Sequence, residues 1–113
     1  MNLPLSKILH GRENELRTLC QAHHVKYLFA FGSSVSANFS DNSSDIDLMV
    51  EIDETDPIEK GELLLDFYMA LQDFFNRKVD LLTDQPIENA YLRENVESTK
   101  VLIYDREGEK VLV

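Results

Sequence analysis

Two aspartates, Asp45 and Asp47, stand two residues apart in a short apolar segment. Ile46 and Leu48 alternate with them, which is the period-two pattern of a β-strand with one buried face. Residues two apart on a strand point to the same side, so both carboxylates would leave one face while the apolar residues face the core. Two carboxylates this close repel each other unless a proton or a cation lies between them.

A third aspartate, Asp80, interrupts an otherwise apolar segment over residues 78–83. If this segment is a strand beside the first one, Asp80 completes a cluster of three carboxylates. Such a cluster suits Mg²⁺ or Mn²⁺, which prefer oxygen ligands. The sequence leaves open a second interpretation, in which Asp80 pairs with Arg77 or Lys78 or lies on an exposed strand face.

A glycine and a serine, Gly32 and Ser33, end an apolar and aromatic segment over residues 25–31. Glycine allows close backbone approach at a strand-to-helix turn. Free backbone N–H groups at the helix start, together with the Ser33 hydroxyl, form an anion site suited to phosphate. Alone, this pair is a common turn. Followed by Asp-x-Asp on one strand and a further strand aspartate, it predicts a phosphate site beside a metal site.

Helices and strands must position these groups. We expect a short helical turn and a loop over 34–44, with Ser6 capping the first helix and Pro57 and Pro86 near the starts of the others. The order of the expected helices and strands along the chain predicts an α/β (α+β) fold, a small mixed sheet with helices packed on one face. The expected helices are 6–23, 56–76 and 87–97, and the expected strands are 25–31, 46–52, 78–83, 101–104 and 110–113, the last two as a hairpin.

The 113-residue chain carries 11 Lys+Arg against 21 Asp+Glu, a formal net charge of −10. Its length predicts a single domain, residues 1–113. The acidic balance argues against direct binding to nucleic acid, which needs clustered Lys and Arg. No run reaches the roughly 18 apolar residues of a membrane span. A lone cysteine, Cys20, and an N-terminus without a secretory pattern predict the cytoplasm as location.

The negative charge is concentrated in one stretch. Between Asp41 and Asp66 the sequence holds ten acids and one base, Lys60. Asp45 and Asp47 account for two of these acids through the predicted metal site. The acidic strip Glu51 to Asp66 is therefore either a solvated face or a docking surface for a basic partner.

Three motifs carry a resemblance to a known family. They are Phe31-Gly32-Ser33, Ser44-Asp45-Ile46-Asp47-Leu48 and Val79-Asp80-Leu81. Together they resemble the nucleotidyltransferase superfamily typified by polymerase beta-like enzymes, and within it the minimal nucleotidyltransferases (MNT), which are single small domains. The resemblance covers nearly the whole chain and implies the nucleotidyltransferase fold.

The resemblance also implies roles for the motif residues. Asp45 and Asp47 would bind two Mg²⁺ ions (or Mn²⁺), and Asp80 would join the catalytic metal and help activate the acceptor hydroxyl. Gly32 and Ser33 would hold the phosphates of a nucleoside triphosphate, with ATP as the expected substrate. The acceptor oxygen would attack the α-phosphorus in line and expel pyrophosphate, while the metals neutralise charge on the attacking and leaving oxygens.

The Gly-Ser turn departs from the family pattern. Members commonly continue it as Gly-Ser-x-Ala-Arg-Gly, whereas here Gly32 to Asn38 contains neither an arginine nor a second glycine. Ser36 and Asn38 can donate hydrogen bonds but carry no positive charge. The candidate nucleotide ligands are therefore Gly32, Ser33, Ser36 and Asn38.

Minimal nucleotidyltransferases of this type often act as antitoxins beside HEPN-domain RNase toxins, where they transfer AMP to a toxin tyrosine. The resemblance therefore implies a HEPN-domain partner, and the acidic surface suits a protein partner. Candidate contact residues are Phe39, Tyr91 and 111–113, and the alternative for 111–113 is a core strand. The alternative is a non-catalytic module of the same fold that neutralises its partner by complex formation. Self-association of the chain is also left open.

Overall fold

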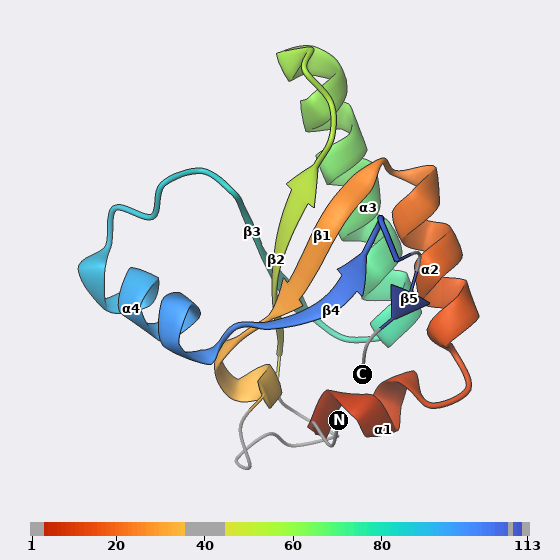
Figure 1. Cartoon of the computed structure of the whole chain (residues 1–113), viewed down its shortest axis with the longest axis horizontal. Helices are drawn as coiled ribbons and strands as arrows, with labels where there is room; N and C mark the ends of the chain where they lie inside the picture. Colours follow the sequence, from red (N-terminus) through yellow and green to blue (C-terminus); the bar gives the residue numbers. More distant parts are fainter. Residues whose placement is uncertain (1–3, 36–44, 109, 112–113) are drawn as a thin grey trace.

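Five strands form one mixed sheet in the spatial order β3-β2-β1-β4-β5 (Figure 1). The computed structural model describes residues 4–35, 45–108 and 110–111. β2 and β3 run parallel, and the other neighbouring strands run antiparallel. The strands are β1 (Val25–Ala30), β2 (Ile46–Ile52), β3 (Val79–Thr83), β4 (Val101–Asp105) and β5 (Lys110–Val111). Each corresponds to a segment that the sequence predicts as strand, and the mixed sheet is confirmed.

The parallel pair β2–β3 needs a crossover, and α3 (Pro57–Phe75) provides it. The Asp56 side chain caps its start by accepting a hydrogen bond from the Ile58 backbone N–H at 3.1 Å. Asn76, in the left-handed conformation with φ 53°, ends it. The helix predicted over 56–76 is thereby confirmed, and it returns the chain so that β3 lies beside β2.

The hydrophobic core lies between one face of the sheet and three helices, α1 (Pro4–Leu9), α2 (Glu13–Ala22) and α3. Alternate residues of β2 supply the sheet side of this core, and all of them are buried: Ile46, Leu48, Val50 and Ile52. Leu5, Leu16, Phe67 and Leu71 are fully buried on the helix side. The prediction of helices on one face is confirmed for these three helices.

The prediction of one helix over residues 6–23 is wrong. The chain forms two helices, and Gly11 lies between them with φ 80°, a left-handed conformation that interrupts the helical ladder. The next residue secures this turn, because the Arg12 guanidinium donates to the Phe74 carbonyl at 2.7 Å and lies 3.9 Å from the Phe74 ring centroid. Ser6 consequently lies inside α1 and does not cap it.

The last helix also differs from its prediction. α4 (Ala90–Thr99) begins three residues after the predicted start, because Asn89 caps it by accepting from the Leu92 N–H at 3.0 Å. Pro86 precedes the helix without opening it. Figure 1 shows α4 apart from the three core helices, and it contacts η1 (Gly32–Val35), the short helical turn after β1. η1 begins two residues before the predicted turn.

Within the described residues, no helix has the length and apolar character needed to span a membrane. The hairpin predicted at the end of the chain is confirmed, since Tyr104 pairs with Val111 and Asp105 with Lys110. Ser36, Asn38 and Phe39 lie outside the described residues. Cys20 is fully buried in the core.

Candidate active site

The start of β2 positions the first two aspartates. Asp45 directly precedes the strand, and Asp47 is its second residue. Ile46 and Leu48 are fully buried in the core, while Asp45 and Asp47 are half-buried. The predicted alternation is therefore confirmed, and the Asp47 carboxylate leaves the sheet on the face that α1, α2 and α3 do not cover.

Asp80 is the direct partner of Asp47 on the neighbouring parallel strand. Partial burial raises the pKa of Asp47, a hydrogen bond from Ser33 opposes the rise, and the nearby Asp80 carboxylate adds to it. The two carboxylates on adjacent strands thus repel each other.

The Gly-Ser turn is hydrogen-bonded to Asp47 of this pair. The Ser33 hydroxyl donates to Asp47 Oδ2 at 3.1 Å. The fully buried Ser34 Oγ accepts from the Asp47 backbone N–H at 2.7 Å, and the Phe31 N–H donates to the Asp47 carbonyl at 3.1 Å. These contacts fix the Asp47 carboxylate against the turn. Ser34 is a positioning residue that the sequence analysis did not single out.

Gly32 makes the close approach possible. Its φ is 59°, and a Cβ added there would lie 3.0 Å from Asp47 Oδ2 and 3.4 Å from Asn95 Oδ1. Only glycine fits this conformation and this space without displacing a neighbour.

The first N–H of the turn, that of Gly32, is not free. This N–H donates to Thr99 Oγ1 at 2.8 Å, because the last residue of α4 packs against the turn. A phosphate could use this amide only after Thr99 released it.

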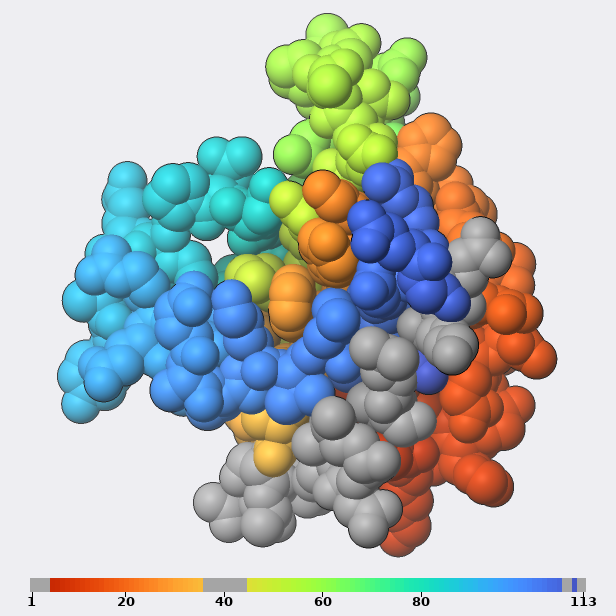
Figure 2. Space-filling model, viewed as in Figure 1, coloured from red at the N-terminus to blue at the C-terminus, as the bar shows by residue number. Residues whose placement is uncertain are grey.

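α4 also forms one wall of a hollow of about 400 Å³ that contains the two paired aspartates. Figure 2 shows the surface hollowed between the cyan segment that leads into α4 and the yellow-green strand β2. The lining is carboxylate on one side and mainly apolar on the other: Phe31, Asp47, Asp80, Leu81, Leu82, Leu92 and Asn95. Sequence analysis missed Asn95 and Thr99, although two polar residues four apart on one helix face could have indicated them.

Lys78 connects Asp45 to Asp80. Its ammonium Nζ lies 3.8 Å from Asp45 Oδ2 and 3.8 Å from Asp80 Oδ1. Asp80 lies beside Asp47 on the neighbouring strand and also pairs with Lys78, as the second interpretation predicts. The expected cluster of three carboxylates is not formed among the described residues. Within residues 4–35, 45–108 and 110–111, no three His, Cys, Asp or Glu side chains converge closely enough to hold a metal ion.

The paired aspartates still fit a divalent cation. Mg²⁺ is usually held by one or two protein carboxylates, with waters and substrate phosphates completing its shell. Asp47 and Asp80 supply two adjacent carboxylates, and the missing Cβ of Gly32 leaves Asp47 Oδ2 accessible. Asp45 could join them once its ion pair with Lys78 is released.

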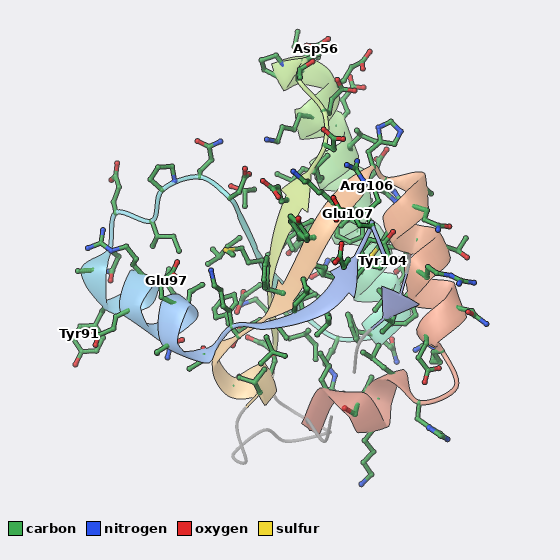
Figure 3. All side chains as sticks on the ribbon, viewed as in Figure 1. Asp56, Tyr91, Glu97, Tyr104, Arg106 and Glu107 are labelled. Atoms are coloured by element: carbon green, nitrogen blue, oxygen red, sulfur yellow. The ribbon has the colours of Figure 1, made fainter. Side chains whose placement is uncertain are left out.

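The residues predicted to contact a partner differ in their exposure. Tyr91 is 89% exposed and points away from the sheet at the outer end of α4 (Figure 3). Val111 packs against the core, as expected if the end of the chain is a core strand. Phe39, Leu112 and Val113 lie outside the described residues.

The acidic strip Glu51 to Asp66 begins near the opposite end of β2 from Asp47. Four residues of extended strand separate Glu51 from Asp47 by about 13 Å. One of its acids, Asp53, pairs with Arg106, whose hydrogen bond lowers the pKa of Asp53. The one base of the strip, Lys60, pairs with Asp84 outside it, with Nζ 3.7 Å from Asp84 Oδ1. Figure 3 shows Asp56 at the far tip of α3. Most of the strip is therefore separate from the aspartate site.

Comparison with known proteins shows which family the chain resembles. The family model described as "Polymerase beta, Nucleotidyltransferase" matches residues 14–109. A protein of Methanocaldococcus jannaschii, named a "putative protein adenylyltransferase", is 30% identical over 99 residues, which are 88% of this chain and 97% of the relative.

Two solved structures share the fold. One is described as a "putative minimal nucleotidyltransferase", with a TM-score of 0.60, 23% identity, and coverage of 84% of this chain and 92% of the other. The second is described as a "toxin-antitoxin with AMP-PNP", with a TM-score of 0.57, 22% identity, and coverage of 87% and 77%. The nucleotidyltransferase fold expected from the sequence motifs is confirmed.

Proposed function

Since the chain belongs to the polymerase beta nucleotidyltransferase family, we propose that it transfers AMP from ATP, with Mg²⁺, to an acceptor hydroxyl. The acceptor is a tyrosine of a HEPN-domain toxin, so that the chain acts as an antitoxin. The observation that carries the proposal is the pairing of Asp47 with Asp80 beside the Gly32–Ser33 turn.

Each group of the site has a task in this reaction. Asp47 and Asp80, joined by Asp45, would hold two Mg²⁺ ions, which supply charge neutralisation on the attacking and leaving oxygens. Ser33 holds Asp47 in place and lies where it can contact the phosphates, with Gly32, Ser36 and Asn38 as further candidates. Asp80 accepts the proton of the acceptor hydroxyl. The acceptor oxygen then bonds to the α-phosphorus, and the bond from the α-phosphorus to pyrophosphate breaks.

The hollow supports a protein acceptor with an aromatic ring. Its apolar wall includes Phe31, Leu82 and Leu92, and such side chains pack well against a ring. Tyr91 and Leu92 are exposed on α4, where a partner protein could bury them. The relative named a protein adenylyltransferase supports the same acceptor class.

Labelled ATP tests this proposal. The purified chain is incubated with a HEPN-domain partner, Mg²⁺ and ATP labelled at the α-phosphate. We expect label on the partner, its loss with a chelator, and its loss in Asp47→Asn. Asp73→Asn, which removes an exposed charge from α3 outside the acidic strip, serves as the matched control and keeps the activity. Transfer by Asp47→Asn at the wild-type rate would contradict the assignment of the site.

The second candidate is a non-catalytic module that neutralises its partner by binding. Two contacts favour it: the Gly32 N–H is bonded to Thr99, and Lys78 pairs with two of the three aspartates. Neutralisation of the toxin by both wild type and Asp47→Ala, without label on the toxin, would establish this candidate and exclude the first.

We also propose that residues 1–113 form one domain that works in the cytoplasm. The burial of Cys20, which raises the pKa of its thiol, is consistent with a reduced core cysteine. A single cooperative unfolding transition, unchanged by a reducing agent, is the expected result. Sedimentation of the chain alone would show whether it associates with itself.

A further inference from the structure

The ammonium of Lys78 occupies a position between two carboxylates where positive charge is needed. It lies 3.8 Å from both Asp45 Oδ2 and Asp80 Oδ1. Together with Asp47 these groups carry three negative charges within one small region, and Lys78 is the cation that pairs with two of them. It therefore acts as their counter-ion in this structure.

These ion pairs are easily exchanged. At 3.8 Å they are longer than a charge-assisted hydrogen bond, and the Lys78 side chain is 65% exposed. Exposed pairs of this kind contribute little to stability. A divalent ion that bound the same carboxylates would displace the ammonium and leave it with a long, flexible side chain beside the site.

The Gly-Ser turn supplies no cation to the site. Gly32 to Asn38 contains no basic residue, although a triphosphate brings about four negative charges. Lys100, at the end of α4, is engaged elsewhere, since its Nζ lies 3.4 Å from Glu97 Oε2 and 5.3 Å from the Phe29 ring centroid. Lys78, in contrast, is a basic residue that already pairs with carboxylates of the site.

We propose that Lys78 is the phosphate-binding base of this site. Without metal it bridges Asp45 and Asp80. When a divalent ion takes these carboxylates, the ammonium turns to the phosphates of the nucleotide and replaces the arginine that the Gly-Ser turn lacks. The inference rests on the proposed function for the identity of the nucleotide, and it adds a prediction that the proposed function does not make: Lys78 opposes metal binding and favours nucleotide binding.

Two binding measurements with opposite expected signs test this inference. Mn²⁺ alone is titrated into the nucleotide-free protein and followed by the paramagnetic resonance of free Mn²⁺. An ATP analogue that cannot be cleaved between the α- and β-phosphates is titrated by calorimetry with Mg²⁺ present. In Lys78→Gln we expect Mn²⁺ to bind more tightly and the analogue to bind about tenfold more weakly. Lys78→Arg should restore the affinity for the analogue.

Lys60→Gln is the matched control. It removes the same charge and breaks a pair of similar length, Lys60–Asp84 at 3.7 Å, outside the site. If only the change in net charge matters, Lys60→Gln and Lys78→Gln will change the two affinities equally. If Lys78→Gln has a folding defect, it will bind both Mn²⁺ and the analogue more weakly.

Unchanged affinity for the analogue in Lys78→Gln, with normal binding by wild type, would overturn the inference and leave the proposed function standing. The same holds if Lys100→Gln loses the affinity and Lys78→Gln keeps it. A wild-type protein that binds no nucleotide would overturn both. Nucleotide binding without label transfer would remove only the catalytic part of the proposed function.

Discussion

The backbone N–H of Gly32 donates a hydrogen bond to the side chain of Thr99, 67 residues further along the chain. Thr99 is the last residue of α4, and its hydroxyl also donates to the Asn95 carbonyl at 2.6 Å. This contact joins the Gly-Ser turn to the helix that lines the hollow. The position of the wall and the conformation of the turn are therefore coupled.

Thr99→Val tests this coupling. The variant keeps the shape of the side chain but leaves the Gly32 N–H without its acceptor, and we expect a loss of about 1 kcal/mol in the free energy of unfolding. Thr99→Ser should restore the stability. Denaturant unfolding gives the measurement. Ser98→Ala is the control, because Ser98 also donates to the Asn95 carbonyl but does not reach Gly32. Equal losses of unfolding free energy in Thr99→Val and Ser98→Ala would show that the contact with Gly32 contributes nothing to stability.

Gly32→Ala should disturb both fold and site. A side chain at φ 59° costs about 1–2 kcal/mol, and the new Cβ would lie 3.0 Å from Asp47 Oδ2. We expect reduced stability in denaturant unfolding and weaker Mn²⁺ binding. Gly61→Ala provides the contrast, since Gly61 lies within α3 with nothing near its Cβ position. That variant should be more stable by up to about 1 kcal/mol and bind Mn²⁺ normally.

The stability of the protein should respond to pH through Asp47. Its pKa is raised in the folded state, mainly by burial, so the folded state holds the proton more strongly than the unfolded state. Stability therefore falls as pH rises from the ordinary aspartate value through the raised one. At neutral pH we expect Asp47→Asn to be more stable than wild type in denaturant unfolding.

Asp53→Asn is the control of opposite sign. The hydrogen bond from Arg106 lowers the pKa of Asp53, so its contribution is present above the ordinary aspartate value and is lost as pH falls through the lowered one. This variant should be less stable than wild type at neutral pH. A stabilising Asp53→Asn together with a destabilising Asp47→Asn would contradict both assignments.

Tyr91 should contribute to partner binding. It is 89% exposed at the outer end of α4, next to Leu92 of the hollow, and a docked protein would bury its ring. We expect Tyr91→Ala to weaken binding of a HEPN-domain partner by about thirtyfold, with unchanged unfolding and nucleotide affinity. Met69→Ala, on the exposed side of α3, is the comparison. If Met69→Ala weakens the complex and Tyr91→Ala does not, the partner binds the other side of the molecule.

The parts of the fold that depend on local periodicity were predictable. The alternation in residues 46–52 gave β2 its bounds, and Asp56-Pro57 marked the start of α3. The break at Gly11 was not predictable, because the apolar stripe continues across it and the turn is secured by Phe74, which is distant in sequence.

The sequence also indicated part of the candidate site. Asp45, Asp47 and Asp80 were found from charge placed in apolar strands, and the register of β2 with β3 brings two of them together. Thr99 and Asn95 were missed, since only the packing of α4 against the turn gives them a role. The bridge made by Lys78 likewise depends on side-chain directions that spacing does not specify.

The two faces of β2 limit which changes in length the segment can tolerate. Ile46 and Leu48 are buried while Asp47 faces the hollow. Deleting or inserting one residue within the strand would exchange these faces, placing a carboxylate in the core and an isoleucine or leucine at the site. Changes of two residues would preserve the alternation. Viable length variants of this strand should therefore differ by even numbers.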